Sequence, residues 1–288
     1  KYTDEGVTPP KRVWDMKTHN AETYGTNVLN AMIGKRFNYP KSLYAVQDTL
    51  RFFVANKPNA LIVDFFAGSG TTLHAVNLLN AEDGGHRRCI LVTNNEVSAD
   101  EAKTLSAQGY QPGDPEWEQY GIARYVTWPR TVCSIEGHDV NGKPLKGDYI
   151  TSGEEPMHMA DGFKANAAFF KLGFLDKNAV ALGRQFKELL PVLWLKAGAH
   201  GPCPSLEEAA EVPAMLVLPE NHFAVLTDES QYETFATQVN IEDAITTVYI
   251  VTDSEPGYRE MISGLHAEDT YQLYRDYLDN FRINHGGR

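Results

Sequence analysis

Cysteines, long apolar runs and export signals are all scarce in this 288-residue sequence. Its three cysteines, Cys89, Cys133 and Cys203, form no CxxC pair, which argues against a disulfide framework or a zinc site and favours a reducing compartment. No apolar run reaches the roughly 18–20 residues that a membrane span needs, and the first residues, KYTDEGVTPPKR, are not typical of a signal peptide. We therefore expect a cytoplasmic protein that makes no contact with a membrane.

Positive charge is scarce as well. The sequence has 38 acidic residues against 26 lysines and arginines, for a formal net charge of -12. Such a chain is poorly suited to binding a phosphate backbone over a broad surface, so we expect any contact with nucleic acid to be local or to involve residues outside these 288. The remaining composition, 42% hydrophobic and 22% charged, is typical of a globular protein with one large domain or two modest ones.

The first half of the sequence alternates between helical and strand patterns. SLYAVQDTLRFF places Leu43, Val46, Leu50 and Phe53 on one face of a helix. NALIVDFF and CILVT are short, β-branched runs typical of buried parallel strands. TTLHAVNLLNA, between them, has helical spacing, and SADEAKTLSAQG, after them, begins with a capping box and ends at a glycine. Together they predict a right-handed βαβ unit in an α/β fold.

The loop DFFAGSGTT, at residues 64–72, joins the first of these strands to its helix. In an open α/β sheet this turn lies at the carboxyl edge, where ligands bind. Gly68 and Gly70 allow a sharp bend and the approach of a ligand that would otherwise meet a Cβ atom. The helix N-terminus offers free N–H groups to an anionic group. The alternative is a tight turn without a ligand, but the strand context and the acid at Asp64 favour a cofactor site.

The residues of the loop discriminate among cofactors. A phosphate-binding P-loop needs a lysine before its Ser/Thr pair, where this sequence has Gly70. A dinucleotide fingerprint needs a small residue where Leu73 stands, and an acid ahead of the glycines is badly placed for a pyrophosphate. Asp64 is well placed for a cationic amino group. S-adenosylmethionine (SAM), which carries an amino group, a carboxylate and a sulfonium, therefore fits the loop better than either nucleotide.

DFFAGSGTT resembles the SAM-binding motif of the amino DNA methyltransferases, which methylate N6 of adenine or N4 of cytosine. RFNYPKSLYAVQDTL, just upstream, resembles the turn and helix that close over the methionine end of SAM in the β-type order of this family. RVWDM resembles the short strand before it. Later stretches, including YGIARYVTWPR, are most similar to the modification subunits of type III restriction–modification systems. The resemblance spans nearly the whole chain and is strongest over residues 37–72.

The resemblance implies a SAM site made of the glycine loop, the turn before the first helix and an acid after the second strand. Its residues are Asp64, Phe66, Ala67, Gly68, Ser69, Gly70, Thr71, Thr72, Tyr39, Pro40, Lys41 and Glu96. In this assignment Asp64 binds the amino group, while Thr71 and Thr72 lie near the carboxylate at the helix N-terminus. The Tyr-Pro-Lys turn covers the methionine moiety, and Glu96 is the nearest acid for the ribose hydroxyls.

The family's [D/N/S]-P-P-[Y/F/W] motif, which holds the flipped target base, is absent from the sequence. TPPK at residues 8–11 lacks the aromatic residue, and DPEW at residues 114–117 lacks the second proline. We therefore expect the C-terminal portion of a longer enzyme, inactive by itself, that binds DNA mainly through an upstream region. The basic residues expected near the loop are too few to replace that region: Lys35, Arg36, Lys41, Arg87 and Arg88.

The second half of the sequence predicts a smaller α/β subdomain. The expected strands are AAFFKLGFL, the hairpin AMLVLPENHFAVLT and the buried run ITTVYIVTD. The expected helices run through residues 178–198, with a bend near Pro191, through ESQYETFATQV, and from about Pro256. A last helix is expected through TYQLYRDYLDNF, whose aromatic residues have helical spacing: Tyr271, Tyr274, Tyr277 and Phe281. No acid or histidine of this half has the spacing of a metal site or a catalytic triad.

These patterns predict a Rossmann-like, SAM-dependent methyltransferase core at residues 1–135, a linker at 136–160 and a C-terminal α/β subdomain at 161–288. The expected function is site-specific DNA methylation at adenine N6 in a restriction–modification system, with DNA as substrate and a restriction subunit or a second copy of the chain as partner. The choice of adenine rests on the resemblance alone. Two alternatives stay open: a module that docks a partner of a modification complex, or a SAM-dependent methyltransferase that acts on RNA or a small molecule.

Overall fold

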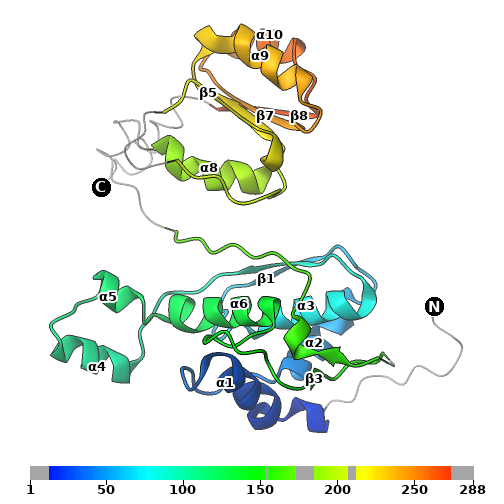
Figure 1. Cartoon of the computed structure of the whole chain (residues 1–288), viewed down its shortest axis with the longest axis vertical. Coiled ribbons are helices and arrows are strands. Elements are labelled where there is room, and N and C mark those ends of the chain that lie inside the picture. Colours follow the sequence, from blue (N-terminus) through cyan, green and yellow to red (C-terminus); the bar gives the residue numbers. More distant parts are fainter. Residues whose placement is uncertain (1–12, 154, 173–184, 207–211, 274–288) are drawn as a thin grey trace, which may run out of the picture. The chain divides into compact units, whose positions relative to one another are not determined.

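The structure is a computed structural model in which residues 13–153, 155–172, 185–206 and 212–273 are described. Its internal contacts divide the chain into two compact units, residues 1–169 and 170–288 (Figure 1). Helices and strands are mixed in both units, which confirms the α/β class. Within the described residues, no helix combines the length and the apolar character needed to cross a membrane.

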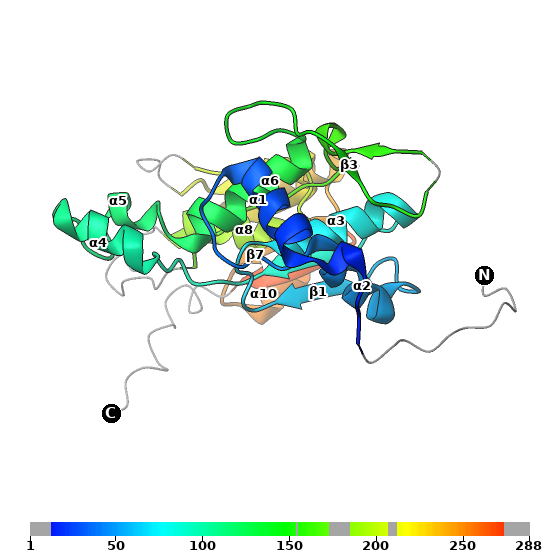
Figure 2. The same ribbon diagram turned by 90° about the horizontal axis from the view of Figure 1, so that it is seen from below.

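The first unit is built mainly of helices, with two separate two-stranded sheets among its described residues. A 3-10 turn (Lys17–His19) and a π-helical turn (Glu22–Thr26) lead into its first helix. The elements that follow are α1 (Asn27–Ile33), α2 (Leu43–Val54), β1 (Leu61–Asp64), α3 (Thr71–Asp83), β2 (Arg88–Leu91), α4 (Ala99–Ala107), α5 (Pro115–Glu118), a π-helical turn (Ala123–Thr127), α6 (Trp128–Glu136), β3 (Asp148–Tyr149) and β4 (Met157–His158). Figure 2 shows α4 and α5 extending to one side of the other helices.

β1 and β2 are parallel, with Leu61 opposite Arg88 and Asp64 opposite Leu91. The βαβ unit formed by β1, α3 and β2 is therefore confirmed. The expectation that both strands are buried is wrong, because their side chains alternate between half-buried and exposed, and Val63 is 43% exposed. In Figure 1, α3 and α6 lie on one side of β1. Helices of this unit thus cover one face of the strands and leave apolar side chains exposed on the other.

The helices before and after β1, α2 and α3, are buried to different extents. α2 and α3 pack against each other along their length. α2 buries Leu43, Tyr44, Gln47 and Val54, whereas Phe53, expected on the inner face, is 70% exposed. α3 is buried almost all round, because it lies between the strands and the helices α2 and α6. The glycine loop therefore leads into the most enclosed helix of the unit.

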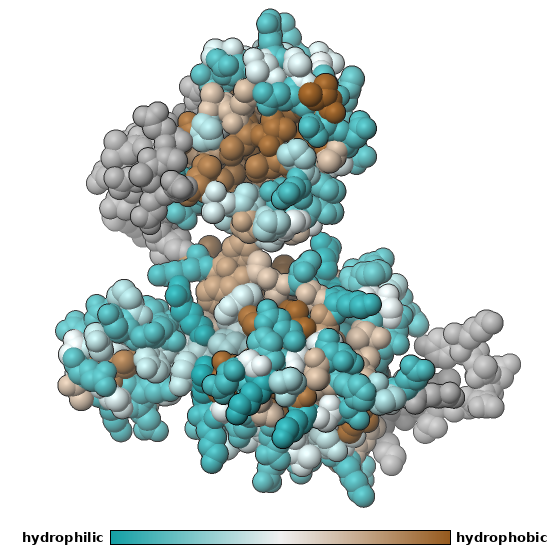
Figure 3. Space-filling view, in the orientation of Figure 1, coloured by the Kyte–Doolittle hydropathy of each residue, from teal (hydrophilic) through white to brown (hydrophobic). Residues whose placement is uncertain are grey.

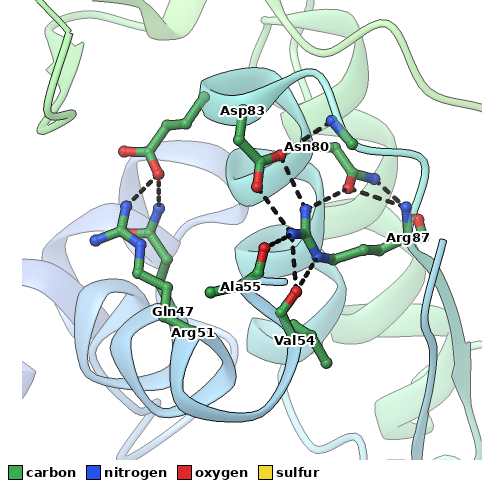
Figure 4. Close-up of polar contacts among 9 residues, drawn as sticks. Gln47, Arg51, Val54, Ala55, Asn80, Asp83 and Arg87 are labelled. Carbon is green, nitrogen blue, oxygen red and sulfur yellow. Dashed lines mark hydrogen bonds and ion pairs between the residues drawn. The ribbon is translucent and has the colours of Figure 1, made fainter. Parts of the chain in front are cut away.

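A buried arginine joins α2, α3 and β2 at the edge of the strands opposite the glycine loop (Figure 4). Arg87 donates through Nη2 to the backbone oxygens of Val54 and Ala55 and pairs with Asp83, while its Nη1 contacts Asn80. The Val54 and Ala55 oxygens belong to the last turn of α2, whose carbonyls have no partner within the helix. The expectation that Arg87 is a basic group beside the loop is therefore wrong, because its role is to cap a helix.

The second unit contains a four-stranded sheet with helices on both faces. Its elements are α8 (Gln185–Lys196), β5 (Met215–Leu218), β6 (Phe223–Leu226), α9 (Tyr232–Ile241), β7 (Thr247–Val251), α10 (Glu255–Ser263) and β8 (Asp269–Leu273). The strand order is β5-β6-β7-β8, with β5 antiparallel to β6 and the other pairs parallel. The expected hairpin, the helix after it, the buried strand and the helix from about Pro256 are confirmed.

The core of this unit has two layers. α8, which contains Pro191, packs on one face of the sheet through Leu190 and Trp194, and α9 and α10 pack on the other through Phe235 and Met261. β6 and β7 are completely buried between these layers. In Figure 3 a band of apolar residues is visible between the more hydrophilic helices of this unit, where the half-buried edge strand β5 lies.

Two expectations for the second half are wrong. Residues 167–172, expected as part of a strand, have no regular secondary structure, and residues 173–175 lie outside the described residues. Tyr271 belongs to β8 and not to a final helix, because β8 pairs with β7 over its full length and Tyr271 stacks on Tyr249 with ring centroids 5.5 Å apart. Strand pairing thus overrides the helical spacing of the aromatic residues, of which Tyr274, Tyr277 and Phe281 lie outside the described part.

Candidate functional site

The glycine loop occupies residues 65–70, between the end of β1 and the start of α3. Both glycines have positive φ, +52° at Gly68 and +75° at Gly70, a region that other residues rarely adopt. The Ala67 N–H donates to Val92 O at 3.2 Å and so ties the loop to the chain just after β2. The Gly70 N–H donates to Ala67 O at 2.8 Å. The loop is a closed turn at the carboxyl ends of both strands.

The two glycines lack side chains for different structural reasons. Within the described part of the chain, and apart from its sequence neighbours, a Cβ atom at Gly68 would have only Phe37 Cζ and Phe66 O within 4 Å, each at 3.8 Å, so this position is open. A Cβ atom at Gly70 would lie 3.2 Å from Thr127 Cγ2, which is tighter than ordinary packing allows. A Cβ atom would thus fit over Gly68, whereas the lack of a side chain at Gly70 makes room for Thr127.

Asp64 links the end of β1 to the start of α3. Its Oδ2 accepts a hydrogen bond from Thr72 Oγ1 at 2.6 Å, and its Oδ1 accepts one from the Phe66 N–H at 3.1 Å. Asp64 and Thr72 also line a cavity of about 340 Å³, together with Val46 and Leu50 of α2. The carboxylate therefore shapes the loop and also faces open space. Phe66, next to it, is 89% exposed.

The Tyr-Pro-Lys turn before α2 is strained, with its first and last residues exposed and its proline buried. Tyr39 has a φ of +62°, which is unusual for a residue with a large side chain, and its side chain is 91% exposed. Pro40 is buried and Lys41 is exposed. A Cβ atom at Gly25 would lie 2.6 Å from Pro40 O, so this turn packs directly on the glycine. Phe37, just ahead of the turn, is the side chain nearest to the open position over Gly68.

Glu96 follows β2 and lies at the base of the arm formed by α4 and α5. The Ile122 N–H donates to Glu96 O at 2.9 Å and closes this base. Glu96 lines a second cavity, of about 240 Å³, with Arg36, Phe37 and Tyr125, and the guanidinium of Arg36 lies 4.4 Å from the centre of the Tyr125 ring. The structure thus brings Glu96 to the same side chain, Phe37, that borders Gly68, while Asp64 lines the other cavity.

Sequence reasoning missed the buried polar groups beneath the loop. Arg130 of α6 is 0% exposed. Its Nη1 donates to Ser69 O at 3.3 Å, to Ser69 Oγ at 3.0 Å and to Thr71 Oγ1 at 2.7 Å. Thr127, also buried, donates through Oγ1 to Gly68 O at 2.7 Å. The hydroxyls of Ser69 and Thr71 therefore point into the protein. The groups left for contact with a ligand are the loop backbone and Asp64, which precedes the loop.

A neutral histidine continues this network away from the loop. Because an arginine can only donate, His74 Nδ1 accepts from Arg130 Nε at 3.4 Å, and the histidine proton resides on Nε2, which donates to Tyr149 Oη at 2.9 Å. Burial, with the positive charge of Arg130 adding to it, holds the pKa of His74 well below its usual value. Burial also lowers the pKa of Arg130 to about 10, so Arg130 remains a cation at neutral pH.

One signal in the sequence could have indicated this buried arginine. Position 130 has the same helical spacing as Val126 and Cys133, at i−4 and i+3, and both neighbours are buried in the core of the unit. A charged residue on an apolar helix face means either that this face is not buried or that the charge is buried with fixed hydrogen-bond partners. Its partners could not be read from the sequence, since Arg130 and Ser69 are 61 residues apart.

Comparison with known families agrees with the geometry of the loop. Residues 1–104, which contain the Tyr-Pro-Lys turn, the glycine loop and Glu96, match the family model of an N6/N4-type DNA methylase. This match ends ahead of α5, α6 and the whole second unit.

Three characterised proteins are similar to parts of the chain. The EcoPI Mod subunit of a type III restriction–modification enzyme of Escherichia phage P1 is 34% identical over 102 residues, covering 35% of the chain and 15% of that protein. The type II methyltransferase M.KpnI of Klebsiella pneumoniae is 40% identical over 86 residues, covering 30% and 20%. The StyLTI Mod subunit of Salmonella typhimurium is 35% identical over 212 residues, covering 67% and 31%.

The chain thus spans between 15% and 31% of the length of these relatives. The similarity to the StyLTI Mod subunit extends over two thirds of the chain, well beyond the residues that the family model matches. Both kinds of match point to the same class of protein: the chain is related to the DNA methyltransferases of restriction–modification systems and resembles their type III modification subunits.

Proposed function

We propose that this chain is the SAM-binding portion of a site-specific DNA methyltransferase that modifies N6 of adenine, and that β1, α3 and β2 belong to its Rossmann-like core. SAM supplies a methyl group bonded to a positively charged sulfur. In the transfer, the amino nitrogen of the base forms a bond to the methyl carbon, the carbon–sulfur bond breaks with its electron pair left on sulfur, and a proton leaves the nitrogen. The residues of this chain would bind and orient the methyl donor.

The observation that carries the proposal is the open position over Gly68. The loop lies at the carboxyl ends of two parallel strands, where ligands of such sheets bind. Gly68 has positive φ, and among the described residues beyond its chain neighbours only Phe37 Cζ and Phe66 O would come within 4 Å of a Cβ atom there. Gly70, by contrast, is explained by packing against Thr127. A ligand that approaches the backbone would use the space over Gly68.

The charges around the loop fit an amino acid. The first N–H groups of α3 have no partner inside the helix and favour a carboxylate. Each oxygen of Asp64 accepts one hydrogen bond and has a second lone pair available for an ammonium group. A ligand with both groups, such as the methionine moiety of SAM, matches this pair. Tyr39, held at positive φ and exposed, is the kind of strained residue that often marks a ligand-binding turn.

Glu96 would bind the ribose hydroxyls of SAM in the cavity next to Phe37. Its side chain is exposed and carries no hydrogen bond that competes with this role among the described contacts. Modification of DNA and pairing with a restriction subunit are proposed from the similarity to type III modification subunits. A cytoplasmic location follows from such a substrate.

Calorimetric titration with S-adenosylhomocysteine, the demethylated product, tests the site. Asp64→Asn keeps an acceptor for the Phe66 N–H but removes the charge, and we expect affinity to fall about 10- to 100-fold, as for a lost charge-assisted hydrogen bond. Gly68→Ala should also weaken binding. Gly142→Ala is its matched control, because Gly142 also has positive φ, +77°, and no atom within 4 Å of a Cβ there. The Gly142→Ala variant should bind the ligand with the affinity of the wild type.

The outcomes separate the roles of the residues. Equal affinity of Asp64→Asn and the wild type would remove Asp64 from the binding site. Equal affinity of Gly68→Ala and Gly142→Ala would mean that the space over Gly68 holds no ligand. No heat from the wild type at any ligand concentration would refute the SAM site itself.

We also expect these 288 residues, expressed alone, to transfer no methyl group to DNA. They contain no [D/N/S]-P-P-[Y/F/W] motif to hold a flipped base, and their net charge of -12 disfavours contact with phosphates. The measurement is transfer of tritiated methyl groups from SAM to mixed-sequence DNA, with a full-length type III modification subunit as the positive control. Transfer by the 288 residues would contradict this expectation and indicate a different base-binding motif.

A further inference from the structure

We infer that Thr127 and Arg130 are positioning residues that set the conformation of the glycine loop from the interior of the protein, and that cofactor affinity depends on them. This inference rests on the proposed SAM site. Neither residue lies in the stretch that the DNA methylase family model matches, which ends at residue 104. Both come from the segment that begins with the π-helical turn Ala123–Thr127 and continues as α6.

The hydrogen bonds of this pair hold the second half of the loop, from Gly68 to the first residue of α3. Thr127 Oγ1 contacts two backbone oxygens, Gly68 O at 2.7 Å and Ile122 O at 3.1 Å, and the shorter contact is to the loop. Arg130 Nη1 holds Ser69 O, Ser69 Oγ and the hydroxyl of the first residue of α3, Thr71. The carbonyls of Gly68 and Ser69 are thus turned inward, so the opposite side of the backbone faces the open position over Gly68.

Packing adds a second constraint. The methyl group of Thr127 occupies the space that a side chain at Gly70 would need, since a Cβ there would lie 3.2 Å from Thr127 Cγ2. The left-handed conformation of Gly70 and the position of Thr127 therefore depend on each other. Thr127 and Arg130 are one helical turn apart, which places both side chains on the same face of the segment.

The charge of Arg130 indicates a role beyond filling the core. Its side chain is 0% exposed, and among the described residues its hydrogen-bond partners are neutral groups and no carboxylate pairs with it. A buried cation without a counter-charge costs stability, and a neutral side chain of similar size would cost less. Arg87, the other buried arginine of this unit, is paired with Asp83. Arg130 supplies Nη1 to the loop, while Nε and Nη2 of the same rigid guanidinium contact His74 Nδ1 and fix its orientation.

The test compares affinity for S-adenosylhomocysteine with thermal stability in matched variants. Thr127→Val removes the hydroxyl and keeps the shape, and we expect roughly tenfold weaker binding, the value of one lost hydrogen bond. Thr127→Ser keeps the hydroxyl and should restore most of the affinity. Thr131→Val is the control: Thr131 is buried on the same helix and donates through Oγ1 to Thr127 O at 2.9 Å, but it does not contact the loop. It should bind as tightly as the wild type.

Arg130→Met should weaken binding more than Thr127→Val, and Arg130→Lys should recover part of the loss, because lysine keeps the charge but not the fork. Amide hydrogen exchange without ligand gives a second readout. In Thr127→Val, the hydrogen-bonded N–H groups of Ala67 and Gly70 should exchange faster, while those of the sheet in the second unit should not change.

The inference fails if Thr127→Val and Thr131→Val bind the ligand equally and their loop amides exchange at the same rate. It also fails if affinity falls only in proportion to a loss of thermal stability shared by both variants. Absence of binding by the wild type would refute the proposed SAM site instead. In that case, faster exchange of the loop amides in Thr127→Val would still support the part of the inference that Thr127 sets the conformation of the loop.

Discussion

The two units of this protein use the same kind of building block, parallel strands joined by a helix, with opposite results. In the second unit every residue of β6 and β7 is buried, and helices cover both faces of the sheet. In the first unit β1 (LIVD) and β2 (RCIL) are also mostly apolar in sequence, but half of their side chains are exposed. The apolar character of a strand therefore does not reveal how many layers cover it.

The interiors of the units differ in a related way. The second unit is held together by two apolar layers, with few buried polar side chains among its described residues. Among its described residues, the first unit buries two arginines, a histidine and several hydroxyl groups, most of them beneath the loop or at the opposite edge of its strands. In the first unit, buried polar side chains thus replace part of an apolar core and hold particular backbone segments in place, among them the glycine loop.

The largest effect expected from this difference is at Arg87. Arg87→Met removes the donors that the guanidinium gives to Val54 O and Ala55 O and the charge that pairs with Asp83, so we expect the first unit to lose roughly 3 kcal/mol of stability. Arg88→Met, at the exposed neighbouring residue, should change stability by less than about 0.5 kcal/mol. Urea unfolding, followed by hydrogen exchange of each unit, measures both. Equal effects would show that the buried arginine adds nothing specific.

A matched pair of substitutions compares the two sheets directly. Val248 of β7 is 0% exposed and Val63 of β1 is 43% exposed. Val248→Thr buries a hydroxyl group among apolar side chains and should destabilise the second unit by about 1–3 kcal/mol. Val63→Thr should cost the first unit less than about 0.5 kcal/mol. If Val63→Thr proved as costly as Val248→Thr, the outer face of β1 would be covered in solution.

The smallest effect expected is a pH dependence from His74. The pKa of His74 is held well below its usual value by burial and by Arg130, while in the unfolded chain it is about 6.5. Above that value both states are neutral, so the histidine contributes no slope. Below it the unfolded chain binds a proton that the folded unit excludes, and stability should fall by up to about 1.4 kcal/mol per pH unit.

The measurement is unfolding of the first unit between pH 7.5 and pH 5, compared with His74→Gln, which does not titrate. The variant should be less stable at neutral pH, since it disturbs the contact with Tyr149, but its stability should depend less on pH. Exchange rates in the second unit, corrected for pH, serve as the internal reference. Identical slopes for the wild type and the variant would mean that His74 is not buried as a neutral group.

Much of the site could be predicted from the sequence because it depends on local chemistry. An apolar run before Asp64, positive φ at two glycines and a helix starting at Thr71 are encoded within a dozen residues, and the structure contains this turn as expected. The N-cap at Ser98 is equally local: its Oγ accepts from the Glu101 N–H as expected, although the Glu101 carboxylate accepts from the Ser98 hydroxyl and not from its N–H. Local interactions of this kind depend little on the surrounding structure, which is why they can be predicted from the sequence without knowledge of the tertiary fold.

The remaining features were decided by contacts between distant segments. Phe53 has the spacing of a core residue but is exposed, Tyr271 has helical spacing but lies in a strand, and Arg87 looks like a surface charge but caps a helix. Each outcome depends on which element packs alongside.

By itself, the sequence determined that there is a glycine loop with an acid before it and a helix after it. Only the tertiary structure decided that Gly68 faces open space, that Gly70 faces Thr127, and that Arg130 lies beneath both. The physical reason is that hydrogen bonds and steric contacts act over a few ångströms, and residues separated by about 60 positions come within that range only after the chain has folded.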